Sequence, residues 1–123
     1  MADILSRIHS AVVLLDADAP DFPEAARQVE ELFRKKRIPL SIKAVHRHSW
    51  ILADSKAELF LSLLPAGGWH LELNARRSRA VFKAGRFQLK GNVFDLVVSS
   101  PDGVPFSQKE IFSRMIRIME QIV

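Results

Sequence analysis

Cysteine is absent from the 123 residues, and this absence excludes several classes of site at once. Disulfide bonds, thiolate zinc sites, iron–sulfur clusters and cysteine nucleophiles all need the thiol that the chain lacks. No apolar run approaches the roughly 20 residues of a membrane-spanning helix, and the N-terminus does not show the basic and apolar regions of a signal peptide. We therefore expect a cytoplasmic protein with no integral membrane association.

Catalytic and nucleotide-binding motifs are missing as well. Gly67 and Gly68 lack the Lys and Ser/Thr of a P-loop and the spacing of a dinucleotide-binding fingerprint. No serine stands in a nucleophile elbow, and Asp16 and Asp18 lie in a proline-flanked loop of the kind that usually makes a turn. We expect a protein that is not an enzyme and uses no cofactor.

The chain does contain enough apolar sequence to build a core. Hydrophobic residues make up 48% and charged residues 26%, a balance typical of a folded globular domain rather than a disordered chain. The length suits one domain over residues 1–123, and no repeat or flexible linker divides it.

Two helices are predicted in the first third of the chain. Residues 3–15 place apolar side chains on one helical stripe, with Asp3 as the N-cap. The run 11–15 is equally typical of a short buried strand that leads into a β-α-β unit, and this alternative stays open. Residues 22–37 predict a second helix, because Pro23 occupies an early helical position ahead of a clear apolar stripe.

From residue 38 to residue 100 the apolar period changes to two, which predicts strands. Apolar residues alternate or cluster over 40–45, 59–64, 69–74 and 93–98. Short connections between these segments favour antiparallel pairing, since parallel strands need longer crossovers. The sequence thus predicts an α+β fold with one or two N-terminal helices, an antiparallel meander of five to seven strands, and a C-terminal amphipathic helix packed on the sheet.

The C-terminal helix is delimited by its own sequence signals. Ser107 and Glu110 form a capping box, and the apolar residues that follow cover a wide helical face. We expect this helix to be largely buried.

Charge is distributed unevenly along the chain. The overall net charge is +4, but residues 1–33 carry −5, residues 34–90 carry +10 and residues 91–123 carry −1. The basic middle segment favours an acidic partner such as a nucleic acid or an acidic protein surface.

A hairpin that turns at Ala84 and Gly85 is predicted within this basic segment. It would place Lys83 opposite Arg86, with a second pair of cations facing each other further from the turn. Opposed like charges destabilise a strand pair, so a binding surface is one explanation. The structural alternative is an exposed strand edge that stays basic and thereby resists aggregation.

The predicted function is a small basic binding module that docks the phosphate backbone of a nucleic acid. Stacking aromatics are absent from the basic face of the hairpin, which argues against base readout. A second basic group at the end of the helix over 22–37 would extend the surface, although cations in a last helical turn also complement the helix dipole. The predicted binding residues are Arg77, Arg79, Lys83, Arg86, Lys90, Arg34, Lys35, Lys36 and Arg37.

Three histidines are candidate metal ligands. His46 and His48 would share a face of a strand, and His70 could complete a three-nitrogen site. A turn near His48 would destroy that geometry, so we expect no bound metal.

A protein-interaction role is the alternative function. Trp50, Trp69, Leu63 and Leu64 add apolar surface beyond what so small a domain readily buries. This excess would suit an adaptor, a chaperone or an assembly factor, alone or as a homodimer.

Overall fold

The computed structural model describes residues 3–47, 52–101, 103 and 105–122. Its five strands form one sheet in which every pair of neighbouring strands runs parallel. The elements are η1 (Ile4–Arg7), β1 (Ala11–Asp16), α1 (Phe22–Lys35), β2 (Leu40–Val45), β3 (Leu59–Ser62), α2 (Trp69–Arg77), β4 (Phe82–Gly85), β5 (Leu96–Val97) and α3 (Gln108–Met119).

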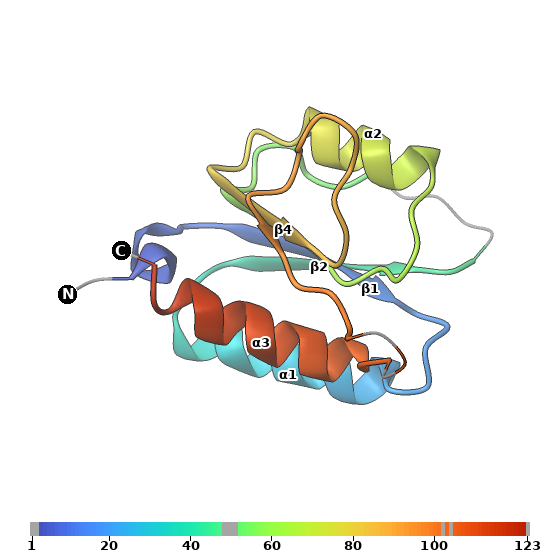
Figure 1. Cartoon of the computed structure of the whole chain (residues 1–123). Coiled ribbons are helices and arrows are strands. Elements are labelled where there is room, and N and C mark those ends of the chain that lie inside the picture. The colour runs from blue at the N-terminus through green and yellow to red at the C-terminus, as the bar shows by residue number, and fades with distance from the viewer. Residues whose placement is uncertain (1–2, 48–51, 102, 104, 123) are drawn as a thin grey trace.

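The strands lie in the order β2-β1-β3-β4-β5, which is one of the common orders of doubly wound sheets. Helices α1 and α3 lie side by side on one face of the sheet, and α2 covers the other face (Figure 1). The two ends of the chain meet at one edge, where the Ile4 N–H donates to the Ile122 carbonyl at 2.7 Å.

The central strand explains this layered architecture. Successive side chains of a strand point to opposite faces. In β1, Val13 and Leu15 pack with α1 and α3, whereas Val12 and Leu14 pack on the side of α2. Both faces are covered, so β1 is apolar from Ala11 to Leu15 instead of alternating with polar residues.

The predicted antiparallel meander is wrong. Residues 69–74 alternate in hydropathy like a strand, but they form α2, in which Leu71 and Ala75 lie four positions apart and are both buried. This helix supplies the long crossover between β3 and β4 that parallel pairing needs.

The predicted helix over residues 3–15 is also wrong. Only Ile4–Arg7 form a short 3-10 turn, which Asp3 caps by accepting from the Ser6 N–H at 3.1 Å. Residues 11–15 are the buried strand that the sequence left open as an alternative.

The hairpin at Ala84 and Gly85 does not exist. Both residues belong to β4, which pairs in parallel with β3 and β5. Gly85 is needed for close packing, because a Cβ atom at this position would come within 2.8 Å of the Phe94 ring. Lys83 and Arg86 are therefore not cross-strand partners.

Other elements form where the sequence predicted them. Helix α1 and strands β2 and β3 fall within the predicted ranges. Helix α3 begins with the complete capping box of Ser107 and Glu110, and its apolar face is buried. Among the described residues, no helix is long and apolar enough to cross a membrane.

Candidate functional site

The chain leaves β1 and β3 in opposite directions. The connection after β1 leads to α1 on one face of the sheet, and the connection after β3 leads to α2 on the other face (Figure 1). The strand order also reverses here, because β2 and β3 lie on either side of β1. In open parallel sheets, such a divergence leaves a crevice outside the carboxyl ends of the strands, and ligands bind there.

A crevice of about 710 Å³ lies at this position. Its walls are the ends of β1 and β2, the connection from β3 to α2, the residue after β4, and the segment that leads into α3. The apolar part of the lining is Ala19, Pro20, Val45, Leu64, Pro65, Ala66, Pro105 and Phe106, and the charged or titratable part is Asp16, Asp18, Asp21, His46, Arg47, His70 and Arg86.

The three carboxylates of the crevice hold its loops together. Asp16 accepts from the Asp18 N–H at 3.0 Å, and Asp18 in turn accepts from the Arg47 N–H at 2.6 Å. Asp21 precedes α1 but accepts from the Lys109 N–H of α3 at 3.0 Å. Each carboxylate therefore accepts from a backbone N–H: Asp16 and Asp18 from loop residues, and Asp21 from the first turn of α3.

Gln108 joins the start of α3 to the end of β1 by two hydrogen bonds. Its side-chain Oε1 accepts from the Asp16 N–H at 3.1 Å, and its Nε2 donates to the Asp16 carbonyl at 2.9 Å. Gln108 is only 2% exposed, so both ends of a buried amide are paired with the backbone at the end of β1. This pair of bonds fixes the start of α3 against the sheet.

Arg86 is the half-buried cation of the crevice. It follows β4, and its Nη2 donates to the Phe106 carbonyl at 3.1 Å and to Ser100 Oγ at 3.5 Å. Burial lowers the pKa of Arg86, while the carboxylates of Asp21 and Asp16 act in the opposite direction. The guanidinium stays charged at any physiological pH.

Asp18 shows the clearest shift among the acids of the crevice. Its pKa lies below the ordinary range, first because it accepts the Arg47 N–H and second because His46 Nδ1 lies 3.2 Å from its Oδ1. The carboxylate is exposed, so these hydrogen bonds rather than burial determine its charge state.

Two of the three histidines, His46 and His70, line the crevice. His46 follows β2 and lies against Asp18, His70 lies in the first turn of α2, and His48 is outside the described residues. In the described part of the chain, no group of three or more His, Cys, Asp or Glu side chains could hold a metal ion.

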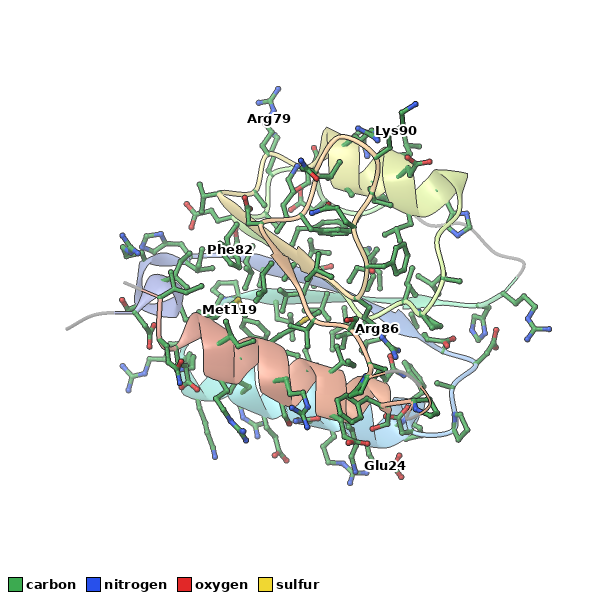
Figure 2. The ribbon with its side chains drawn as sticks, in the orientation of Figure 1. Glu24, Arg79, Phe82, Arg86, Lys90 and Met119 are labelled. Atoms are coloured by element: carbon green, nitrogen blue, oxygen red, sulfur yellow. The ribbon has the colours of Figure 1, made fainter. Side chains whose placement is uncertain are left out.

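The predicted basic surface is divided between different parts of the molecule. Arg77 ends α2 and Arg79 follows it, whereas Arg86 lies at the other end of β4 (Figure 2). Lys83 is half-buried, and its Nζ donates to the Ala75 carbonyl at 2.8 Å. Lys90 lies in the connection from β4 to β5, where its carbonyl accepts from Arg76 Nη2 at 2.6 Å.

The second basic group lies on the opposite layer from α2. Arg34 and Lys35 are in the last turn of α1, and Lys36 Nζ pairs with Glu120 at 3.3 Å. Arg37 adopts a left-handed backbone conformation with φ of 58° just after the helix. These four residues lie at or just after the C-terminus of α1, so their position agrees with the structural explanation of cations at a helix C-terminus.

The apolar residues behind the interaction hypothesis are partly accounted for by the core. Leu63 is 0% exposed and Leu64 is 6% exposed, so neither forms a surface patch. Trp50 lies outside the described residues.

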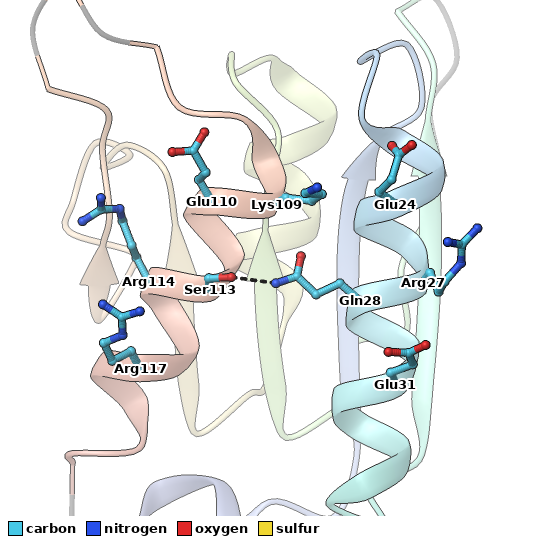
Figure 3. Close-up of a pocket in the computed structure, with 9 residues that line it drawn as sticks. All are labelled: Glu24, Arg27, Gln28, Glu31, Lys109, Glu110, Ser113, Arg114 and Arg117. Atoms are coloured by element: carbon cyan, nitrogen blue, oxygen red, sulfur yellow. Dashed lines mark hydrogen bonds between the residues drawn. The ribbon is translucent and has the colours of Figure 1, made fainter.

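A second hollow lies on the outer surface between α1 and α3, and we call it the α1–α3 groove. Its volume is about 470 Å³, and its walls are charged side chains of the two helices (Figure 3). On its floor, Gln28 Nε2 donates to Ser113 Oγ at 2.7 Å, while Gln28 Oε1 is buried with no partner among the described residues. The lining consists of Glu24, Arg27, Gln28, Glu31, Lys109, Glu110, Ser113, Arg114 and Arg117.

Sequence reasoning missed the crevice as a site. Asp16 and Asp18 were assigned to a turn, which is accurate locally because the Asp16 carboxylate does accept from the Asp18 N–H. The available signal was position: these acids directly follow an uninterrupted apolar run, as the carboxyl end of a buried parallel strand requires.

Comparison with protein-family models, with curated proteins and with solved structures finds no match for this chain.

Proposed function

We propose that the chain is a non-enzymatic binding module that takes a small organic molecule in the crevice at the carboxyl ends of β1 and β3. The observation that carries this proposal is the coincidence of a hollow of about 710 Å³ with the point where the two connections diverge. Doubly wound sheets bind their ligands at this point.

The lining supports the same proposal. Ligand sites of proteins are typically clefts of about 300 to 1,000 Å³ with mainly apolar walls and a few polar groups. The crevice has the required volume, and Leu64, Pro65 and Phe106 contribute apolar surface beside the cation of Arg86. Its carboxylates are engaged with backbone amides, which suits a preformed site better than a catalytic one.

Docking of a nucleic-acid backbone stays a prediction, and it has lost its structural basis. The expected hairpin is absent, Lys83 donates to the Ala75 carbonyl of α2, and the cations at the end of α1 lie on the other face of the sheet from α2 (Figure 1). We therefore still propose a binding function, but with a small molecule rather than a nucleic-acid duplex as the ligand.

A neutral aromatic probe tests the proposal without assuming the natural ligand. 1-Naphthamide has thirteen non-hydrogen atoms, and at about 0.3 kcal/mol per atom its Kd should be of the order of 1 mM. We expect saturable binding by nuclear magnetic resonance, with the largest shifts at Leu64, Ala66 and Phe106.

A variant that fills the crevice tests whether the probe binds there, and a matched variant at a distant position is the control. Ala66→Trp places an indole at the wall of the crevice and should weaken probe binding at least tenfold, whereas Val81→Trp adds the same group at a position 69% exposed before β4. Binding that is absent from the parent, or equal in the two variants, would contradict the proposed site.

A further inference from the structure

We infer that Arg86 recognises an anionic group of the ligand, a carboxylate or a phosphate, on the side of its guanidinium that faces Gly67 and Phe87. This inference rests on the proposed function, because it names the chemical class of the molecule that occupies the crevice.

Arg86 lies between two hollows. It lines the crevice, and it also lines a smaller hollow of about 350 Å³ whose other residues are Pro65, Ala66, Gly67, Phe87 and Ser100. The two hollows share the segment that leads from β3 to α2, so one elongated molecule could contact both.

The charges on the two sides of Arg86 differ. Asp16 and Asp21 line the crevice side and stabilise the guanidinium through space. None of the described residues that line the smaller hollow is acidic, so within the described structure Arg86 is the charged group of that hollow. Helix α2 also starts beside this hollow, and its N-cap is Gly68, which has no side chain to cap the helix. The positive end of the helix dipole therefore adds to the field of Arg86.

Some N–H groups of the Arg86 guanidinium make no hydrogen bond within the described structure. The guanidinium carries five N–H groups, and the two contacts to Ser100 and Phe106 both use Nη2. Among the described residues no acceptor is bonded to Nε or Nη1, which leaves three N–H groups for a ligand. The Nη2 bonds hold the side chain in place, and a partly desolvated cation attracts an anion more strongly than one in water.

The hollows around Arg86 also contain apolar side chains, which indicate the uncharged part of the ligand. Leu64, Pro65 and Phe87 border the region around Arg86 and suit an aromatic or aliphatic body. The expected ligand is therefore an amphipathic organic anion, with its charged group at Arg86 and its apolar part along the connection from β3 to α2.

An isosteric pair of probes tests this inference. 1-Naphthoate and 1-naphthamide have the same shape and differ in charge, and 1-naphthyl phosphate distinguishes a phosphate site from a carboxylate site. We expect an anionic probe to bind the parent protein at least tenfold more tightly than the amide at pH 7 and low salt. In Arg86→Met this preference should vanish, while the affinity for the amide stays within twofold.

Two further variants separate recognition from folding. Arg79→Met removes an exposed arginine on the far side of β4 and should leave all three affinities unchanged. Arg86→Lys keeps the positive charge and should retain part of the preference, which gives a usable measurement if Arg86→Met melts too low.

The outcomes also separate this inference from the proposed function. If the amide binds the crevice but neither anion binds better, or the preference survives in Arg86→Met, Arg86 is not the anion site and the proposed function stands. If no probe binds at millimolar concentration, both proposals are wrong.

Discussion

The crevice and the α1–α3 groove each contain a glutamine, and the side-chain amides of the two glutamines differ in how many of their hydrogen bonds are made. Gln108 in the crevice has both ends of its amide paired with the backbone of Asp16. Gln28 in the groove has one bond, to Ser113, and a buried Oε1 with no partner in the described structure. Exchanging its amide atoms leaves Nε2 unpaired instead, since a hydroxyl can donate or accept.

This difference reflects how each hollow is built. The crevice exists because backbone connections diverge, and its polar side chains are bound to backbone groups of the loops they shape. The groove is the solvated seam between two helices, with side chains of both signs on its walls (Figure 3). The comparison favours the crevice as the preformed ligand site, and four measurements test it.

The largest effect is expected in the hydrophobic core, on the buried face of α3. Ile116 is 6% exposed, and Ile116→Ala should lower the free energy of unfolding by about 2 to 5 kcal/mol through the cavity it leaves. Ile118, on the same helix but 38% exposed, should cost under about 1 kcal/mol when changed to alanine. Equal melting temperatures for the two variants would show that α3 is not packed on the sheet.

Gln108→Leu comes next, because it removes the acceptor of the Asp16 N–H and one of the two donors to the Asp16 carbonyl, which keeps the Ala19 N–H at 3.3 Å. We expect a loss of about 1 to 3 kcal/mol in chemical denaturation, the cost of one unpaired, largely desolvated group. Gln121→Leu, at an exposed position after α3, is the control and should have little effect. A mild effect at Gln108 would mean that these bonds do not organise the crevice.

Gln28→Leu with Ser113→Ala should change stability far less. Replacing both members of a half-satisfied pair by apolar groups is close to neutral, so we expect a change within about 1 kcal/mol of the parent. A loss as large as that of Gln108→Leu would erase the contrast between the two hollows and show that the buried Gln28 oxygen has a partner.

The smallest effect concerns Asp18. Its pKa is lowered in the folded state, so its contribution to stability is fully present above the ordinary aspartate value of about 3.9 and is lost as pH falls through the lower folded value. Titration of the Asp18 carboxyl by nuclear magnetic resonance should therefore give a midpoint below that ordinary value.

His46→Ala sharpens this titration. The backbone N–H of Arg47 is the largest single cause of the lowered pKa, so part of the depression should survive without the imidazole. A return to the ordinary value in this variant would assign the effect to His46 instead.

Local signals predicted several elements well. The capping box at Ser107 and the proline near the start of α1 mark real helix starts, because both act through neighbouring backbone groups. Alternating hydropathy misled the prediction at residues 69–74, because a helix with Leu73 partly exposed can show the same short pattern. That error removed the crossover between β3 and β4, and together with the hairpin expected at Ala84 and Gly85 it favoured antiparallel pairing.

The sequence by itself determined that the chain folds around an apolar core without disulfides, where its last helix starts, and that its charge is uneven. The direction of the strands, the crevice between β1 and β3, and the position of Arg86 between two hollows were decided only by the tertiary structure. The physical reason is that strand direction depends on which distant segments pair, and Arg86 meets Ser100 and Phe106 only after β4 has joined the sheet. Local periodicity carries no record of that pairing.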